Sequence, residues 1–370
     1  MINKTSVLYI ILMALLSSCG QHDRYVLIQG YAQGGTYSVK YNTLGKDGKI
    51  RLSPEEVRSA VDSILESIDN TLSGYNKGSL LSRLNSGDTI EFTPGGMLDE
   101  IYGMAASFYE ETDGALDVAA GPLFDIWGFG FTTDSMPSPD KVRETAASCG
   151  MGRLKKDMKQ AARNGRVDAA CLLGPNAGST SAARGEKTPE PMLPVLNFNA
   201  IAQGYSCDLV ARYLYGIGVK DMLVDIGEIF CDGVNPAGRP WRVGIDRPFD
   251  GNDTPGQDLD GIWESPSAPC GIVTSGNYRK FYVRDGHKYS HTIDPRTGYP
   301  VEHNLLSATI TAPTATEADA YATYCMVIGL DNAKQFISDN AGRLTGYLIY
   351  SDEDGNMCEW ASEGFSIAGQ

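Results

Sequence analysis

The chain has 370 residues, of which 42% are hydrophobic and 21% charged, so it is long enough to bury a large core in one domain or two. Its 31 lysines and arginines stand against 46 aspartates and glutamates, and the net charge of −15 argues against nucleic acid as a partner. An anionic ligand is not excluded, because a bound cation can reverse the local field.

Residues 1–18 have the pattern of a secretory signal peptide. One lysine precedes an apolar run over 7–16, which is too short to span a bilayer. The run ends in the letters LSSCG at 16–20, which resemble a bacterial lipobox and predict cleavage before Cys19 and acylation of that residue. The acyl chains, with a tether over 19–24, would anchor the protein to a bacterial cell membrane facing the periplasm, with the inner membrane preferred. The alternative is a plain signal peptide whose cysteine is incidental.

Seven of the eight cysteines follow Cys19, and they show neither a metal-ligand spacing nor a disulfide framework. No two form a Cys-X-X-Cys pair, their number is odd, and several lie in apolar runs, where a thiol behaves as a small buried hydrophobe. One bridge is possible, but the spacing cannot assign it. These residues are Cys149, Cys171, Cys207, Cys231, Cys270, Cys325 and Cys358.

The N-terminal part of the mature chain predicts a hairpin and two helices. Residues 25–41 alternate β-branched and aromatic residues around Gly34-Gly35, which is typical of a β-hairpin. The letters SPEE at 53–56 supply an N-cap serine, a first-turn proline and a glutamate, and the apolar residues that follow fall on one helical face as far as Leu72. A second helix is expected over 97–111.

The stretch 153–192 is expected to be a flexible insertion in a single domain over 25–370. Its first part is basic and polar, and the letters GPNAGSTSAARGEKTPEP at 174–191 include almost no large apolar side chain. No phosphate-loop pattern occurs in it, so no catalytic role is expected there.

After this stretch, strands and helices follow one another without a fixed repeat. Hairpins are more evident than strand–helix–strand units, which favours an α+β fold with mixed, largely antiparallel sheets packed against helices. The expected strands cover 193–199, 221–231, 241–245, 270–274, 278–284, 305–312 and 344–350, and the expected helices cover 202–215, 316–329 and 332–340, with a polar loop over 248–268.

The helix expected from Thr316 has the features of a metal site. With Thr316 as N-cap, Asp319 lies in the first turn, where a carboxylate is favoured. Asp319 and Thr323 are four residues apart, so their oxygens share one face, and such oxygens suit a hard cation such as Mg²⁺. The alternative is that Asp319 only stabilises the helix start and that Thr323 only packs.

Four further stretches carry polar or aromatic residues with two possible roles each. The junction over 197–208, with Gln203 and Asp208, can hold phosphate at a helix start or be an ordinary connection. The apolar, turn-rich stretch 114–130 around Asp117 can line a pocket for a flat ring or form a core corner. Tyr75 can stack on a ring or cap the core edge. The letters HTIDPRTG at 291–298 form a rigid turn that can hold His291 in place.

Taken together, these stretches resemble the ApbE family of flavin transferases, whose fold is related to the T-fold. The matching pieces occur in the family's order from residue 34 to residue 329. They are GTY at 35–37, SGYNKGSLLSRLN at 73–85, GALDVAAGPLFDIWGFG at 114–130, FNAIAQGYSCDLVARYL at 198–214, MLVDIGEIF at 222–230, TSGNYRKFY at 274–282, YSHTIDPRTGYPVEH at 289–303 and EADAYATYCMVIG at 317–329.

The resemblance implies a Mg²⁺-dependent FAD:protein FMN transferase. Such an enzyme cleaves the pyrophosphate of FAD, attaches FMN through a phosphoester to a threonine of a target protein and releases AMP. The implied targets are flavoprotein subunits of membrane redox complexes, such as the Na⁺-translocating NADH:quinone reductase and Rnf complexes. Positioning and charge neutralisation should supply most of the rate of this phosphoryl transfer.

The resemblance also implies a role for individual residues. Asp319 and Thr323 match side-chain ligands of Mg²⁺, and Ala200 matches a ligand that acts through its backbone carbonyl. His291 matches the general base for the incoming threonine, or alternatively a phosphate contact, and a neutral imidazole suits the former near neutral pH. The residues implied in binding FAD are Gly34, Tyr75, Leu116, Asp117, Val118, Asn197, Gln203 and Ile293.

Three departures from the family pattern leave other outcomes open. Many members have lysine at Gln203, aspartate at Asn197 and Gly-Gly where this chain has Gly227-Glu228. Loss of the lysine weakens a direct charge contact with phosphate. One alternative is a Mg²⁺-dependent FAD pyrophosphatase, which would use water as the acceptor. Another is a flavin-binding lipoprotein without catalysis, against which the retained Asp319, Thr323 and His291 argue.

Overall fold

The computed structural model describes residues 24–45, 48–130, 136–174, 194–249, 251–252, 254, 256–278, 281–284 and 287–368. The expected signal peptide, Cys19 and most of the tether lie outside these residues. Within them, no helix is both long enough and apolar enough to cross a membrane.

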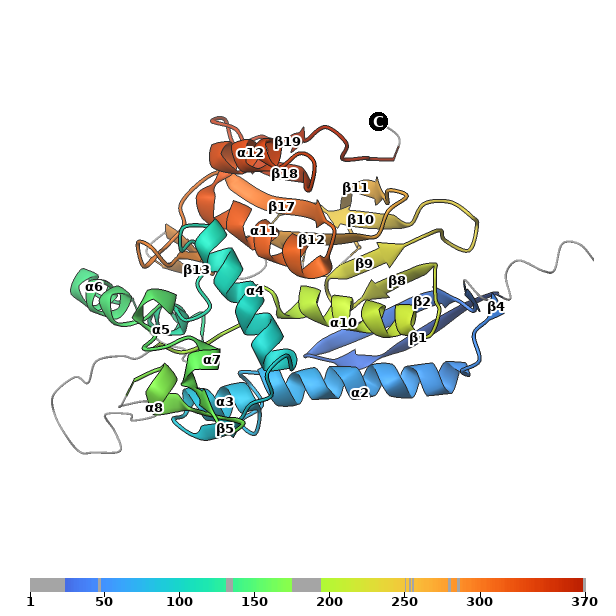
Figure 1. Ribbon diagram of the computed structural model, residues 1–370. Helices are drawn as coiled ribbons and strands as arrows, with labels where there is room; N and C mark the ends of the chain where they lie inside the picture. Colours follow the sequence, from blue (N-terminus) through green and yellow to red (C-terminus); the bar gives the residue numbers. More distant parts are fainter. Residues whose placement is uncertain are drawn as a thin grey trace, which may run out of the picture.

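The centre of the fold is an eight-stranded sheet in which all neighbouring strands are antiparallel (Figure 1). Neighbouring strands are often distant in sequence, so the sheet joins the N-terminal hairpin to the C-terminal strands. In sheet order the strands are β1 (Tyr25–Ala32), β2 (Gly35–Asn42), β8 (Met222–Asp225), β9 (Ile229–Asp232), β12 (Cys270–Gly276), β17 (Leu305–Ala312), β18 (Thr345–Ser351) and β19 (Met357–Ala361). This architecture confirms the predicted α+β class.

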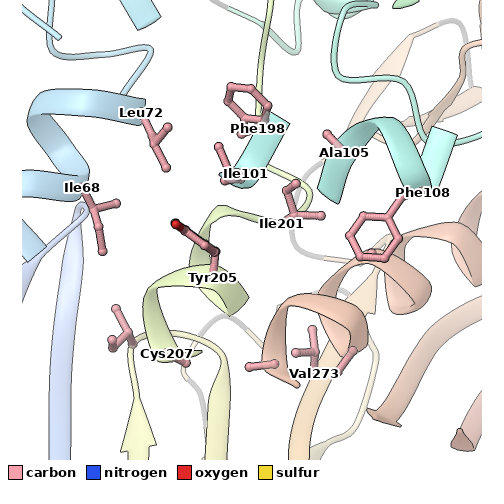
Figure 2. Close-up of a cluster of buried hydrophobic side chains, with 14 of the residues drawn as sticks. Ile68, Leu72, Ile101, Ala105, Phe108, Phe198, Ile201, Tyr205, Cys207 and Val273 are labelled. Atoms are coloured by element: carbon pink, nitrogen blue, oxygen red, sulfur yellow. The ribbon is translucent and has the colours of Figure 1, made fainter. Parts of the chain in front are cut away.

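Helices cover one face of this sheet and bury the main core against it (Figure 1). Figure 2 shows side chains of three helices and of β12 converging in this core. The helices are α2 (Pro54–Leu72), α4 (Met97–Glu111), α10 (Ala202–Gly216), α11 (Ala315–Ile328) and α12 (Leu330–Asp339). The predicted capping box of α2 is present, since Ser53 and Glu56 each accept a hydrogen bond from the other's backbone amide.

A second, smaller core lies on the opposite face of the sheet. On β12, Val273 belongs to the helix-covered core, whereas its neighbour Ile272 belongs to the second one. This division follows from the alternation of side chains along a strand. The hairpin of β10 (Arg242–Asp246) and β11 (Leu259–Glu264) covers the second core with Trp241 and Trp263.

The remaining elements are short and lie mainly in the connections. They are β3 (Leu44–Gly45), β4 (Gly48–Lys49), α3 (Leu80–Asn85), β5 (Thr89–Glu91), α5 (Gly121–Ile126), α6 (Pro139–Ser148), η2 (Met151–Arg153), α7 (Met158–Ala161), β6 (Ala162–Arg163), β7 (Arg166–Asp168), α8 (Ala169–Leu172), β13 (Phe281–Arg284), β14 (His287–Ser290), β15 (Ile293–Asp294) and β16 (Tyr299–Pro300).

The prediction of a flexible insertion over 153–192 is wrong for residues 153–174. This part forms short helices and strands, and β7 pairs with β5, so a three-stranded sheet joins it to the segment between α3 and α4. Met158, Val167 and Leu172 are fully buried in the main core. Residues 175–192 lie outside the described part of the chain.

Three other predicted boundaries also need correction. The strand expected over 193–199 is reduced, in its described residues, to a single bridge between Val195 and Ala120. The strand expected over 221–231 is a hairpin, β8–β9, because the chain turns at Gly227 with a φ of 92°. The polar loop expected over 248–268 contains β11.

Candidate active site

A cavity of about 400 Å³ opens where the sheet, α10, α11 and the 114–130 stretch meet. Nearly all the residues proposed from the sequence line it, although they come from distant parts of the chain. These lining residues are Tyr75, Leu116, Asp117, Val118, Asn197, Ala200, Gln203, His291, Ile293, Asp319 and Thr323. Gly34 is not among the lining residues: it occupies the β1–β2 turn, with a φ of 80°.

Asp319 and Thr323 lie on α11 and both reach the cavity. Asp319 is only 5% exposed, and its Oδ2 accepts a hydrogen bond from the backbone amide of Gly204 at 3.0 Å. Burial, with a smaller contribution from the charge of Asp208, raises the pKa of Asp319 to about 8. The hydroxyl of Thr323 lies 3.4 Å from the hydroxyl of Ser275 on β12. A bound cation would therefore relieve the cost of ionising Asp319.

The carbonyl of Ala200 is made available by the way α10 begins. Ala200 lies just before α10, whose N-cap is Ile201, and the first amide to bond within the helix is that of Tyr205, which donates to the carbonyl of Ile201 at 3.0 Å. No intrahelical amide therefore occupies the Ala200 carbonyl, and the Gly204 amide, which is in the first turn, donates to Asp319. The close approach of α10 to α11 depends on glycine at position 204, because a Cβ there would lie 2.3 Å from the carbonyl oxygen of Ala315.

These groups fit a magnesium ion by their chemistry. A carboxylate, a hydroxyl and a backbone carbonyl are hard oxygen donors, and Mg²⁺ keeps waters and substrate phosphates among its ligands. In the part of the chain that the structure describes, no three His, Cys, Asp or Glu side chains gather into a metal-binding group. The site would therefore depend on Thr323, Ala200 and oxygens from a ligand or water, with Asp319 as its carboxylate.

The start of α11 is capped differently from the sequence expectation. Thr314, not Thr316, is the N-cap, and its hydroxyl accepts from the amide of Glu317 at 3.1 Å. Asp208 on α10 accepts hydrogen bonds from the amides of Ala315 and Thr316, each at 2.9 Å. Asp208 therefore ties the start of α11 to α10. Its burial raises its pKa.

Asp117 holds a turn of the cavity wall. Its Oδ1 accepts from the amide of Ala119 at 2.8 Å, and its two oxygens accept from the amide of Met151 at 2.9 and 3.0 Å. Gly150 allows this approach, since a Cβ there would lie 2.7 Å from Asp117 Oδ2. The carboxylate therefore fixes the loop that carries Leu116 and Val118, and burial raises its pKa.

Asn197 is positioned by contacts on both sides. Its backbone amide donates to the carbonyl of Val118 at 2.7 Å, and its Oδ1 accepts from the amide of Asn199 at 2.9 Å. Asn85 holds the preceding residue by accepting from the amide of Leu196 at 2.9 Å and donating to its carbonyl at 2.8 Å. Sequence reasoning assigned no role to Asn85, although it ends a motif that matched the family.

Gln203 packs against the β8–β9 turn. Its Nε2 donates to the carbonyl of Ile226 at 3.4 Å, and a Cβ at Gly227 would lie 2.5 Å from that nitrogen. Gly227 also has a positive φ, so two observations favour glycine at this position. Glu228, which follows it, also lines the cavity and was not proposed as a site residue.

Tyr75 is 72% exposed at the cavity although the loop that carries it is well fixed. The hydroxyls of Ser79 and Ser82 both donate to the carbonyl of Ser73, at 2.6 and 3.0 Å. The amide of Asn76 donates to the Ser73 hydroxyl at 3.0 Å. A large aromatic ring on a rigid loop is suited to stacking on a flat ligand.

The turn at 291–298 is rigid, as its sequence predicts. The amide of Gly298 donates to the carbonyl of Asp294 at 2.8 Å, and Arg296 forms a two-pronged ion pair with the Asp294 carboxylate. Trp127 Nε1 donates to the carbonyl of Gly298 at 2.7 Å, which ties the turn to the 114–130 stretch. His291 is half-buried at the cavity. Its ring and that of Phe129 are arranged edge to face, with 6.4 Å between the ring centroids.

The cavity thus combines two chemical environments. One part presents oxygen donors and the start of α10, which suit a cation and phosphate groups. The other part presents apolar and aromatic side chains, including Tyr75, Leu116 and Phe124, which suit a flat ring system. A nucleotide carrying both a diphosphate and a large heterocycle has this combination of features.

Comparison with known proteins assigns the chain to a family. Residues 34–348 match the model of the ApbE family. A Haemophilus influenzae relative named FAD:protein FMN transferase is 29% identical over 357 residues, which cover 95% of this chain and 94% of the relative. An Escherichia coli K12 relative of the same name is 31% identical over 316 residues, covering 84% of this chain and 81% of the relative.

Solved structures agree with this assignment. The flavin transferase ApbE from Vibrio cholerae superimposes with a TM-score of 0.70 at 29% identity, covering 92% of this chain and 98% of that one. The flavinyl transferase ApbE of Pseudomonas stutzeri, in its apo form, gives a TM-score of 0.71 at 28% identity, with coverages of 92% and 95%. The expected fold and transferase class are confirmed, and the chain is a member of the ApbE family.

Proposed function

We propose that this protein is a Mg²⁺-dependent FAD:protein FMN transferase that acts on a threonine. The threonine oxygen forms a bond to the phosphorus of the FMN half of FAD. The bond from that phosphorus to the bridging oxygen breaks, and AMP leaves with this oxygen. The observation that carries the proposal is the meeting of oxygen donors, an imidazole and a ring-binding wall in one cavity.

In this proposal Asp319, Thr323 and the carbonyl of Ala200 hold Mg²⁺. When bound, the ion would neutralise charge on the pyrophosphate. The residues around it keep its ligands in place. Gly204 orients the Asp319 carboxylate through its amide, and Asp208 fixes the start of α11 against α10. Such preorganisation lowers the reorganisation needed in the transition state.

His291 accepts the proton of the incoming threonine hydroxyl. An imidazole is suited to this role because its ordinary pKa lies near neutral pH. The rigid turn that follows limits the freedom of the imidazole, since Asp294 and Gly298 close the turn and Trp127 anchors it. The backbone of Ile293, in the same segment, contacts FAD.

The isoalloxazine ring of FAD occupies the apolar part of the cavity. Tyr75 stacks on it, and Leu116 and Val118, which also line the cavity, pack beside it. Asn197, in the segment before α10, and Gln203, in its first turn, donate hydrogen bonds to polar groups of FAD. Glutamine carries no charge, so charge neutralisation at the phosphates depends on the cation. Gly34 contacts FAD only if the β1–β2 turn approaches it, because Gly34 does not line the cavity.

We also propose that the mature chain is a lipoprotein, acylated at Cys19 and facing the periplasm from the inner membrane. Its acceptors are then threonine-bearing flavoprotein subunits of membrane redox complexes, of the Na⁺-translocating NADH:quinone reductase or Rnf type. An anchor would hold the cavity near such membrane-bound substrates.

The test is intact mass spectrometry of a threonine-containing acceptor domain incubated with the protein, FAD and Mg²⁺, with AMP measured in the same samples. The acceptor should gain the mass of FMN less one water, in step with the release of AMP. EDTA and Asp319→Ala should abolish both. The matched control Asp339→Ala, which removes an exposed carboxylate on α12, should behave as wild type. AMP with free FMN and no adduct would instead establish an FAD pyrophosphatase.

A further inference from the structure

Cys231 on β9 and Cys270 on β12 are directly opposite each other in neighbouring antiparallel strands. The strand register pairs Cys270 with Cys231, followed by Gly271 with Phe230 and Ile272 with Ile229. Directly opposite residues of such strands have Cα atoms about 4.5–5.5 Å apart. Disulfides span Cα separations of roughly 4.4–6.8 Å. Both cysteines are free thiols in the structure, and their expected Cα spacing falls within the disulfide range.

Both side chains also lie on the same face of the sheet. They belong to the second core, under Trp241 and Trp263, whereas Phe230 and Val273 belong to the helix-covered core. Rotation about χ1 turns the thiols toward each other, and a small approach of the two strands would bring Cβ atoms that are about 4.5–5.5 Å apart into the disulfide range of roughly 3.5–4.5 Å. Burial, and next the repulsion of a Cys270 thiolate, raise the pKa of Cys231, which is consistent with two close thiols.

We propose that Cys231 and Cys270 form a cross-strand disulfide in the exported protein. This proposal depends on the signal peptide expected over 1–18, because disulfides persist in the bacterial periplasm and are rare in the cytosol. It does not depend on the proposed reaction. It assigns the one bridge that the spacing of the cysteines leaves open.

The bridge would form by exchange with an oxidant of the protein-disulfide or oxidised-glutathione class. One cysteine thiolate attacks the disulfide of the oxidant, forming a mixed disulfide and releasing one thiol. The second thiolate then attacks the mixed disulfide and releases the other thiol, so two electrons pass to the oxidant. Cys231 and Cys270 are 0% and 5% exposed, so the exchange precedes packing of the β10–β11 hairpin over them.

The bridge would close the connection between β9 and β12 into a covalent loop. The chain between the two cysteines carries the β10–β11 hairpin, which forms a separate two-stranded sheet. The same two strands lead into the cavity wall, since Glu228 precedes β9 and Thr274 and Ser275 lie on β12. A bridge would therefore fix the strand pair that supports this wall.

The test is peptide mapping of the full chain, expressed with its leader and alkylated in denaturant before any reduction. The expected result is a peptide pair joining Cys231 to Cys270, with the other five mature cysteines alkylated. Alkylation of all seven cysteines that follow Cys19, both in the exported protein and after refolding with oxidised glutathione, would overturn the proposal. A bridge between any other pair would also overturn it.

Thermal unfolding with and without a reductant gives a second measurement. Reduction should lower the Tm of the wild type by about 5–10 °C, because the bridge closes a long loop. It should have no effect on the Cys231→Ala/Cys270→Ala variant, and Cys358→Ala should respond as the wild type does. Equal Tm values for oxidised and reduced wild type would contradict a stabilising bridge.

Discussion

The backbone amide of Gly204 on α10 donates a hydrogen bond to Asp319 Oδ2 on α11, at 3.0 Å. This contact joins two helices that are far apart in sequence and orients the carboxylate toward the cavity. It also satisfies one of the first-turn amides of α10, which have no acceptor within their own helix. A single hydrogen bond between two helices thus positions the carboxylate among the three proposed magnesium ligands.

Replacing Gly204 by alanine should separate the two helices and disrupt this arrangement. The added Cβ would lie 2.3 Å from the carbonyl oxygen of Ala315 and 2.9 Å from Cβ of Asp319. We expect a loss of about 1–3 kcal/mol in the free energy of unfolding, as is usual for overpacking, and at least a tenfold fall in transfer rate. Urea denaturation and the acceptor assay measure the two effects.

The control for this variant is Gly216→Ala, at the other end of the same helix. A Cβ there meets no atom within 4 Å, so stability and rate should stay near those of the wild type. If Gly204→Ala and Gly216→Ala had the same stability and the same transfer rate, the close approach of α10 to α11 would not be needed for either property.

Replacing Asp319 by asparagine should stabilise the metal-free protein at alkaline pH. Burial raises the pKa of Asp319 to about 8, so between its ordinary pKa near 4 and pH 8 the folded state binds more protons than the unfolded state. The stability of the wild type therefore falls as pH rises through this window. Asparagine does not titrate and can still accept from Gly204.

The measurement is thermal unfolding in EDTA at pH 5 and pH 8. We expect the free energy of unfolding of Asp319→Asn to exceed that of the wild type at pH 8 by an amount on the order of 5 kcal/mol, and the difference to shrink at pH 5. Adding Mg²⁺ at pH 8 should raise the Tm of the wild type alone. A pH-independent difference would contradict a buried, titrating carboxylate.

Replacing His291 by alanine should abolish transfer while leaving the binding of FAD largely intact. In the proposed mechanism the imidazole acts on the acceptor hydroxyl, and the cavity that binds FAD keeps its other lining residues. The dissociation constant of FAD and single-turnover transfer should be measured on the same preparation. Unchanged transfer would remove His291 from the mechanism, and a large loss of FAD binding would favour its role as a phosphate contact.

Replacing Trp127 by phenylalanine should loosen the turn that carries His291. The change removes the indole donor and leaves the buried carbonyl of Gly298 without that hydrogen bond, which costs about 1–3 kcal/mol. We expect kcat to fall more than the affinity for FAD, since the altered turn lies next to the proposed base. Trp360→Phe, on β19, is the matched control; an identical kcat in both variants would refute the coupling.

The sequence was sufficient for features that depend on local patterns. The capping box at Ser53, the face shared by Asp319 and Thr323, and the rigid turn at Asp294 all follow from residues a few positions apart. The resemblance of ordered motifs then brought together the residues that line the cavity. Spacing alone left each motif with an ordinary structural alternative.

Features that depend on distant contacts could not be predicted in this way. Thr314 and Thr316 are both acceptable N-caps, and the choice is made by Asp208, which lies far away in sequence and occupies the amide of Thr316. The stretch 153–174 is polar in composition, yet its β7 strand pairs with β5, a partner that local periodicity does not reveal. The β8–β9 turn likewise depends on Gly227 packing against Gln203.

The most direct test of the central claim is a crystal structure of the protein with FAD and Mn²⁺ as a substitute for Mg²⁺. The anomalous signal of Mn²⁺ should lie within ligand distance of Asp319, Thr323 and the carbonyl of Ala200, with the pyrophosphate of FAD completing the coordination and the flavin ring beside Tyr75. FAD bound elsewhere, or Mn²⁺ bound away from Asp319, would contradict the assignment of this cavity as the active site.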